Sequence, residues 1–292
     1  MLNPVVTPFF HASTGSWSYV VADETAGVAV VIDPVLDFEL RSGRTGTHSA
    51  RRIVEHCRAH GLHVEWILET HAHADHLSAA AWLQSELGGR IGIGEGIRSV
   101  QATFARIYGL GADFATDGSQ FDHLFRDGES FGIGSLEGRV LGTPGHTSDS
   151  VSYVVGDAVF IGDTLFMPDV GSARCDFPGG DAALLYRSVQ RLYALPAHTR
   201  VFVCHDYPPD GRDSRAETSI AEQRTANLHL RDGVTEGEYV ERRTARDSTL
   251  DLPQLLIPAV QVNIRGGRLP APDPNGTRYL KIPLDLLGRA PN

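Results

Sequence analysis

The N-terminal part of the chain alternates short apolar runs with glycine-containing breaks. Val5–Phe10, Trp17–Ala22 and Val28–Ile32 are rich in branched and aromatic residues, and Gly15 and Gly27 separate them. Runs of this length and composition, bounded by turn residues, are typical of β-strands. The pattern predicts that the chain begins with three consecutive strands.

Farther along the chain, segments in which apolar residues have strand-like spacing alternate with segments in which they have helical spacing. The expected strands are Val64–Leu68, Arg90–Gly94, Arg139–Leu141, Ser150–Val155, Ala158–Ile161, Arg200–Cys204 and Tyr279–Leu284, and the expected helices are Ser49–His60, Leu77–Leu87, Ile97–Tyr108, Ala182–Leu195, Ser214–Leu230 and Gly237–Thr249. Segment 110–125 reads as irregular. Alternation of this kind predicts an α/β sandwich, with helices covering sheet layers and a site in loops at one edge.

Composition narrows the class of protein. The 292 residues are 41% hydrophobic and 21% charged, an ordinary globular balance. The net charge of −10, without basic clusters, argues against nucleic-acid and membrane-surface binding. No apolar run approaches the roughly 18 residues of a membrane span, and the first residues lack a secretory pattern. Three widely spaced cysteines indicate a reducing compartment, so we expect a cytoplasmic protein.

Polar side chains crowd the segment that follows the predicted strand Val64–Leu68. His71, His73, Asp75 and His76 fall within six residues of one another. Imidazole and carboxylate groups are ligands for zinc, iron and manganese. A protein core has no use for so many polar groups at one point, because each would need its own buried partner. The segment therefore predicts a metal site.

Three later clusters also place a potential ligand where a strand meets a loop. His146 lies in Gly142–Thr147, Asp163 follows the strand Ala158–Ile161, and His205 follows the strand Arg200–Cys204. Glycines beside His146 and Asp163 allow close approach of backbone segments. One such cluster would be weak evidence, but four in order along the chain are strong evidence for a metal centre.

Together these clusters resemble the metallo-β-lactamase superfamily, with its HxHxDH motif, distant His, Asp and final His. The resemblance covers roughly residues 5–230 and implies an αββα sandwich with the metal site at one edge. It divides the chain into a catalytic domain, residues 1–230, and a C-terminal extension, residues 231–292, packed on the same domain. Because this superfamily hosts many chemistries, the fold alone does not give the function.

Finer motifs resemble one branch of that superfamily. Gly171–Phe177, the His205-Asp206-Tyr207 run and Glu222–Asn227 are similar to segments of the persulfide dioxygenases, also called sulfur dioxygenases. The tail, Asp247–Leu284, resembles bacterial proteins labelled β-lactamase hydrolase-like. The resemblance implies oxidation of glutathione persulfide by O₂ to sulfite and glutathione at a mononuclear non-haem Fe(II) site.

The resemblance also implies roles for individual residues. One Fe(II) per chain would be held by His71, His146 and Asp163. Catalytic roles would fall to Arg174 and His205, and substrate contacts to Arg174, Tyr207 and Arg224. His73, Asp75, His76 and His205 would either orient the ligands or form a second metal site.

Three other functions remain open at this point. A binuclear hydrolase of glyoxalase II type, cleaving a glutathione thioester, would use all seven potential ligands. A lactonase or β-lactamase fits less well without a secretory segment, and a metal-binding regulatory module is a non-enzymatic alternative. The expected partners are glutathione persulfide and O₂, with no nucleic acid and no membrane. A homo-oligomer and a rhodanese-type sulfurtransferase partner are compatible with the resemblance.

Overall fold

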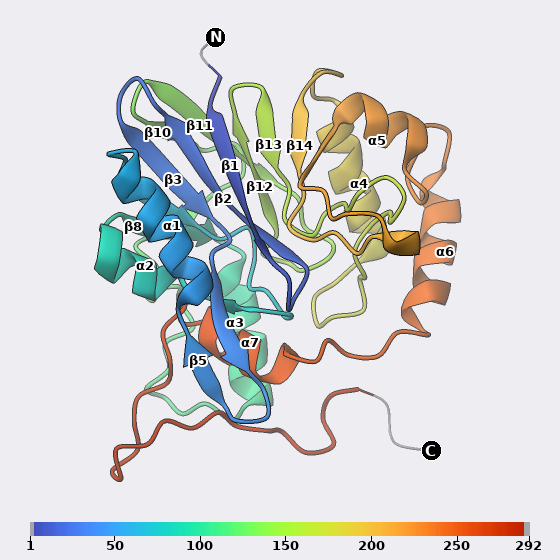
Figure 1. The fold of residues 1–292 in the computed structure, drawn as a ribbon. Helices are drawn as coiled ribbons and strands as arrows, with labels where there is room; N and C mark the ends of the chain where they lie inside the picture. The colour runs from blue at the N-terminus through green and yellow to red at the C-terminus, as the bar shows by residue number, and fades with distance from the viewer. Residues whose placement is uncertain (1–2, 289–292) are drawn as a thin grey trace.

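Two six-stranded sheets form the centre of the molecule, which the computed structural model describes for residues 3–288 (Figure 1). The first sheet has the strand order β1-β2-β3-β6-β8-β9. Its strands are β1 Val5–His11, β2 Ser16–Asp23, β3 Val28–Ile32, β6 His63–Leu68, β8 Arg90–Gly94 and β9 His123–Phe125. The three N-terminal strands pair antiparallel as consecutive neighbours, whereas β3, β6, β8 and β9 run parallel.

The second sheet has the order β10-β11-β12-β13-β14-β15. Its strands are β10 Ser130–Ile133, β11 Leu136–Gly142, β12 Val151–Val155, β13 Ala158–Phe160, β14 Arg200–Phe202 and β15 Glu217–Ser219. Only β13 and β14 are parallel, and the other pairs are antiparallel. A separate small sheet joins β5 Arg44–Gly46, β4 Val35–Glu39 and β7 Leu77–Ser78.

Helices cover the outer face of each sheet. They are α1 His48–Ala59, α2 Ala80–Leu87, α3 Ile97–Ile107, α4 Ala182–Tyr193, α5 Ile220–Ala226, α6 Glu236–Asp247 and α7 Leu256–Asn263, with a short 3₁₀ turn η1 at Pro209–Gly211. Figure 1 shows α1 and α2 on one side of the sheets and α4, α5 and α6 on the other. Buried side chains of α1, α2, α3 and α7 pack on the first sheet, and those of α4, α5 and α6 pack on the second.

The two-residue period of the strands creates three separate cores. On β2, Tyr19 and Val21 point to the core between the sheets, while Val20 and Ala22 point to the outer core under the helices. Successive side chains of a strand face opposite sides, so a strand buried on both faces is apolar throughout. The αββα sandwich predicted from the sequence is therefore the observed fold.

Several predicted boundaries were wrong. Leu77 and Ser78 form the strand β7 instead of the first turn of a helix, because they pair with β4. Segment 214–230 contains the strand β15 before the short helix α5. No strand forms at 279–284, and the expected irregular segment 110–125 ends in β9. In the part described, no helix combines the length and apolar character that crossing a bilayer requires.

Candidate metal centre

Each predicted donor lies in a loop that follows a strand. The loop after β6 carries His71–His76, and the loop after β11 carries His146. Asp163 follows β13 and His205 follows β14. Because β13 and β14 run parallel, Asp163 and His205 leave the second sheet at the same edge. The fold thus gathers donors from distant parts of the sequence.

Two glycines let these loops pass close to their neighbours. Gly162 has a φ of 51°, and a Cβ there would lie 2.5 Å from Thr70 Oγ1. Gly145 has a φ of 140°, and a Cβ there would lie 2.3 Å from the backbone nitrogen of Leu185. Both positions therefore need glycine for its conformation and its size.

The structure brings His71, His146 and Asp163 together. One donor atom from each lies within 4.8 Å of the others, and all three residues are buried. His146 Nε2 and Asp163 Oδ2 are 3.7 Å apart. The spacing suits three ligands that share one ion, as the family resemblance implies for these residues.

Hydrogen bonds determine which ring nitrogen His71 and His146 each offer to a metal ion. His146 Nδ1 donates to the carbonyl of Arg174 over 2.7 Å. His71 Nδ1 lies 3.1 Å from Thr70 Oγ1, whose hydroxyl donates to Asp33 Oδ2 over 2.8 Å, so the hydroxyl accepts from the imidazole. In both rings Nδ1 carries the proton, and Nε2 keeps its lone pair for a ligand.

Buried polar atoms without partners provide the test of whether these residues fit a metal. His71 Nε2 and Asp163 Oδ1 are buried and have no hydrogen-bond partner within residues 3–288. Leaving such atoms unpaired is unfavourable in a protein interior. A cation bound between them would satisfy both, so the donor set fits a metal ion.

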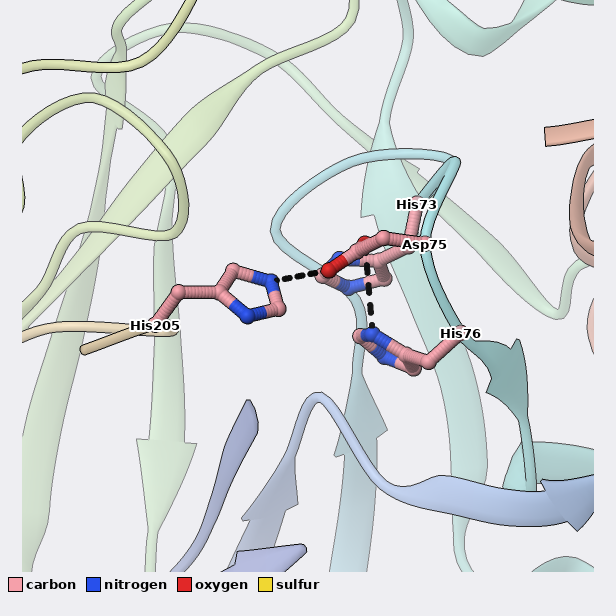
Figure 2. A group of neighbouring side chains, drawn as sticks. All are labelled: His73, Asp75, His76 and His205. Carbon is pink, nitrogen blue, oxygen red and sulfur yellow. Dashed lines mark ion pairs between the residues drawn. The ribbon is translucent and has the colours of Figure 1, made fainter. Parts of the chain in front are cut away.

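A second group of donors adjoins the first. His73, Asp75, His76 and His205 also offer atoms within 4.8 Å of one another. Figure 2 shows Asp75 between two rings, with its carboxylate 2.9 Å from His205 Nε2 and 3.5 Å from His76 Nδ1. His76 Nε2 and His205 Nδ1 are buried without hydrogen-bond partners in the described chain, and the short contact of His205 Nε2 with Asp75 lacks hydrogen-bond geometry. This geometry suits a second ion as well as an ordering role.

The electrostatics of the two groups follow from burial and from the carboxylates. Burial holds the pKa of His71 well below the ordinary value and lowers the pKa of His76 to about 4, which keeps both rings in the neutral, ligating form. Burial opposes charge on His205 too, but Asp163 and Asp75 raise its pKa well above the ordinary value. The buried carboxylate of Asp163 and the partly buried carboxylate of Asp75 thus favour a neighbouring cation, either an imidazolium or a metal ion.

Asp33, directly after β3, is a site residue that the sequence motifs did not identify. Its Oδ1 accepts from the backbone of Thr70 over 2.7 Å and from His73 Nε2 over 3.0 Å. Glu69 Oε2 lies 3.4 Å from the same nitrogen of His73. Asp33 also adopts a positive φ of 48°, which Asp tolerates better than most residues. One buried carboxylate therefore orients both His71, through Thr70, and His73.

A cavity of about 1240 Å³ opens onto Asp75, His146 and Asp163. Its other walls come from the β4–β5 hairpin, from the loop before α4 and from α6 with the segment that follows it. The walls include aromatic and arginine side chains, namely Phe38, Arg41, Phe166, Arg174, Phe177, Tyr207, Arg243 and Arg246, beside acidic ones, namely Glu39, Asp169 and Asp251. The cavity can hold a small molecule with both apolar and anionic parts.

Arg174 and Tyr207 both line this cavity, as a substrate-binding role requires. The Arg174 guanidinium is engaged by Asp176, with nitrogen–oxygen distances of 2.6 and 2.8 Å, and lies over the Phe177 ring. Tyr207 stacks on His205, with ring centroids 5.6 Å apart and planes 3° from parallel. Arg174 also acts through its carbonyl, which orients His146.

Among the predicted substrate contacts, Arg224 is the one that the structure does not bring to the cavity. Its guanidinium lies 2.9 Å from Asp232 and is partly exposed on α5. Asp232 holds the pKa of Arg224 above its ordinary value. The predicted contact between Arg224 and substrate therefore has no support in this arrangement. Like Asp33, the cavity arginines Arg41 and Arg246 were not identified from the sequence.

The sequence profile of the metallo-beta-lactamase superfamily matches residues 13–205, which contain every donor described above. The chain belongs to this superfamily. Its donor set and its family membership together indicate a bound metal.

Relatives within the superfamily carry different names. The chain is 52% identical to a beta-lactamase hydrolase-like protein of Agrobacterium fabrum over 97% of its own length, but spans only 65% of that protein. It is 49% identical to glyoxylase B2 of Dictyostelium discoideum, covering 97% of both chains. It is 30% identical to the human mitochondrial persulfide dioxygenase ETHE1, covering 88% of this chain and 87% of that one.

The crystal structure of ETHE1 from Myxococcus xanthus is similar throughout its length. The two structures superpose with a TM-score of 0.72 at 30% sequence identity, covering 90% of this chain and 100% of the other. The similarity therefore includes the two sheets and reaches beyond residue 205, where the superfamily profile ends.

Proposed function

We propose that the protein is a persulfide dioxygenase that oxidises glutathione persulfide with O₂ at one Fe(II) ion per chain. The observation that carries this proposal is the arrangement of His71, His146 and Asp163, whose potential ligand atoms converge in a buried site. Two histidines and one carboxylate form the ligand set of non-haem Fe(II) oxygenases and leave positions open for other ligands. Similarity to proteins named persulfide dioxygenase supports the same reaction.

The reaction is balanced when water takes part. Glutathione persulfide, O₂ and water give glutathione and sulfite, because the persulfide loses four electrons to O₂ and its S–S bond breaks. Bound iron would supply the electron transfer between sulfur and O₂ that closed-shell side chains cannot supply. The chain's own residues would hold that iron, orient its ligands and position the substrate.

The cavity offers separate contacts for the two ends of glutathione persulfide. Phe166 and Tyr207 form an aromatic wall beside the donors, against which the apolar part of the substrate can pack. Arg41 and Arg246 line the cavity, and neither guanidinium forms an ion pair with the side chains that the structure describes. Free guanidinium groups bind carboxylates well, and glutathione carries two of them.

A binuclear hydrolase of glyoxalase II type is the second candidate. It is favoured by the His73–Asp75–His76–His205 group, which could hold a second ion beside the first. Two metal ions held there would supply an activated water for hydrolysis of a glutathione thioester, which needs no O₂. The relative named glyoxylase B2 is in keeping with this alternative.

Oxygen uptake separates the two functions. We expect anaerobically purified protein, given glutathione persulfide, to consume O₂ and release one sulfite for each O₂. Asp163→Asn should abolish O₂ uptake. Asp157→Asn is the control and should leave uptake unchanged, because Asp157 pairs with Arg200 at the opposite end of β13. Cleavage of a glutathione thioester without O₂ uptake would contradict the proposal. The cytoplasmic location, a homo-oligomer and a rhodanese-type sulfurtransferase partner remain predictions.

A further inference from the structure

The C-terminal helix α7 contacts the loop that carries four of the potential metal donors. Its last residue, Asn263, is buried, with 4% of its surface exposed. Asn263 Nδ2 donates to the carbonyls of His73 and His76, each over 2.8 Å, and its Oδ1 accepts from the backbone of Ser78 over 2.8 Å. One amide therefore ties together both ends of the 73–76 turn and the strand that follows it.

Asparagine is suited to this position by its chemistry. Its side chain has two donor hydrogens and an acceptor oxygen, and here it uses all three functions. Aspartate would place a carboxylate oxygen against two carbonyls, and alanine would leave two buried carbonyls and a backbone N–H unpaired. Residues 73–76 form no helix or strand of their own, so their position depends on contacts of this kind.

The preceding helix, α6, contacts the other donor-bearing region in a similar way. Asp247 Oδ2 accepts from the backbone of Cys175 over 2.9 Å, and Arg243 donates to the carbonyl of Ser172 over 3.0 Å. The two side chains form a buried ion pair with a distance of 2.6 Å. Arg174, whose carbonyl orients His146, lies between these two anchored residues.

We propose that α6 and α7 are part of the metal centre, in which Asn263 and Asp247 are positioning residues for the two donor-bearing loops. Asn263 acts through the His71–His76 loop, and Asp247 acts through the Arg174 carbonyl that orients His146. The inference rests on the metal site of the proposed function, but not on the identity of the metal or on the reaction. Coupling of this kind is reciprocal, so metal binding must in turn stabilise α7.

Metal release from variants tests the first half of the proposal. We expect Asn263→Asp to release Zn²⁺ or Fe²⁺ to a chelator about tenfold faster than the unmodified chain, the lower end of the effect of groups that orient ligands. Asn275→Asp is the matched control, because Asn275 lies exposed on the same extension and bonds only its own neighbours. Equal release from both variants would overturn the role of Asn263.

The same comparison applies to Asp247. Asp247→Asn should also speed metal release, whereas Asp232→Asn, which breaks an exposed pair with Arg224, should leave it unchanged. Unchanged release from Asp247→Asn would remove α6 from the proposal.

Hydrogen exchange in the unmodified chain keeps the proposal testable if a variant does not fold. We expect the amides of Ser78 and α7 to exchange more slowly in protein loaded with Zn²⁺ than after chelation. Amides of α5, which the proposal does not couple to the metal, provide the internal control. Identical exchange of α7 with and without metal would overturn the proposal. Because these readouts do not involve turnover, failure of the dioxygenase assignment and failure of this inference are distinguishable.

Discussion

At the scale of single residues, the orientation of each donor depends on a partner that is not itself a donor. The Thr70 hydroxyl donates a hydrogen bond to Asp33 and accepts one from His71, and the Arg174 carbonyl accepts one from His146. Such partners fix the tautomer of a ligating imidazole and raise its basicity. The lone pairs that face the centre are thus set before any ion binds.

The Thr70 hydroxyl can be removed without changing the size of the side chain much. Thr70→Val leaves His71 Nδ1 without its acceptor, so metal affinity should fall about tenfold, measured by competition with a chelator. Thr70→Ser keeps the hydroxyl and is the control. Affinity that is equal in the Val and Ser variants would show that the relay through Thr70 does not matter.

The cavity arginines give a second prediction at this scale. Arg246→Ala should raise KM for glutathione persulfide while leaving kcat nearly unchanged, because it removes binding that the ground state and the transition state share. Arg224→Ala, outside the cavity, should leave both constants near their original values. If Arg224→Ala raised KM and Arg246→Ala did not, the placement of the substrate would be wrong.

At the scale of elements, close passage between loops and helices constrains the site. Gly145 abuts the start of α4, where a Cβ would meet the Leu185 backbone, while a Cβ at Gly132 would meet nothing within 4 Å. Gly145→Ala should therefore lower the free energy of unfolding by about 2 kcal/mol or more, and Gly132→Ala by much less. Chemical denaturation measures both, and equal losses would contradict the close contact.

The contact between α6 and the segment before it gives a pH prediction. His229 accepts a hydrogen bond from the backbone of Ser172 and lies near Arg243, Arg242 and Arg246. Burial, followed by these arginines, lowers the pKa of His229 to about 4. Folding therefore favours the neutral ring, and its contribution is complete above about pH 6.5 and is lost as the pH falls toward 4.

Replacing His229 tests that sign. His229→Gln keeps an acceptor but cannot become charged, so its stability should fall less between pH 7 and pH 4.5 than that of the unmodified chain. Thermal unfolding across this range measures the difference. A steeper fall in the variant would contradict the assignment.

Some elements could be predicted from sequence and others could not, for physical reasons. The strand β3 matches its predicted range because it is apolar throughout and bounded by turns. Helix α7 was missed because it is buried on nearly all sides and so lacks the amphipathic period. Alternating apolar residues at 279–284 predicted a strand, but Ile282 and Leu284 are exposed and pair with no sheet edge.

At the scale of the whole molecule, the metal centre forms where two sheets and the C-terminal helices meet. The donor motifs could be found in the sequence because several ligands fall within six residues and each cluster follows a strand. Asp33, Asn263 and the cavity arginines could not, because their contacts join positions that are far apart in the chain. Periodicity reports local structure and contains no information on such pairings.

The charge distribution of the whole chain agrees with a small anionic substrate. A net charge of −10 repels anions in general, whereas Arg41 and Arg246 place positive charge at two positions of the cavity wall. Placed positive charges within an acidic surface favour specific over general attraction of anions.

The nature of the bound metal tests the central claim most directly. We predict that anaerobically isolated protein contains about one iron per chain, and that its nitric oxide complex gives one S = 3/2 electron paramagnetic resonance signal per iron, altered when glutathione persulfide is added. Asp163→Asn should lose both the iron and the signal. Two tightly held zinc ions per chain in a fully active enzyme, with no such signal, would contradict the account.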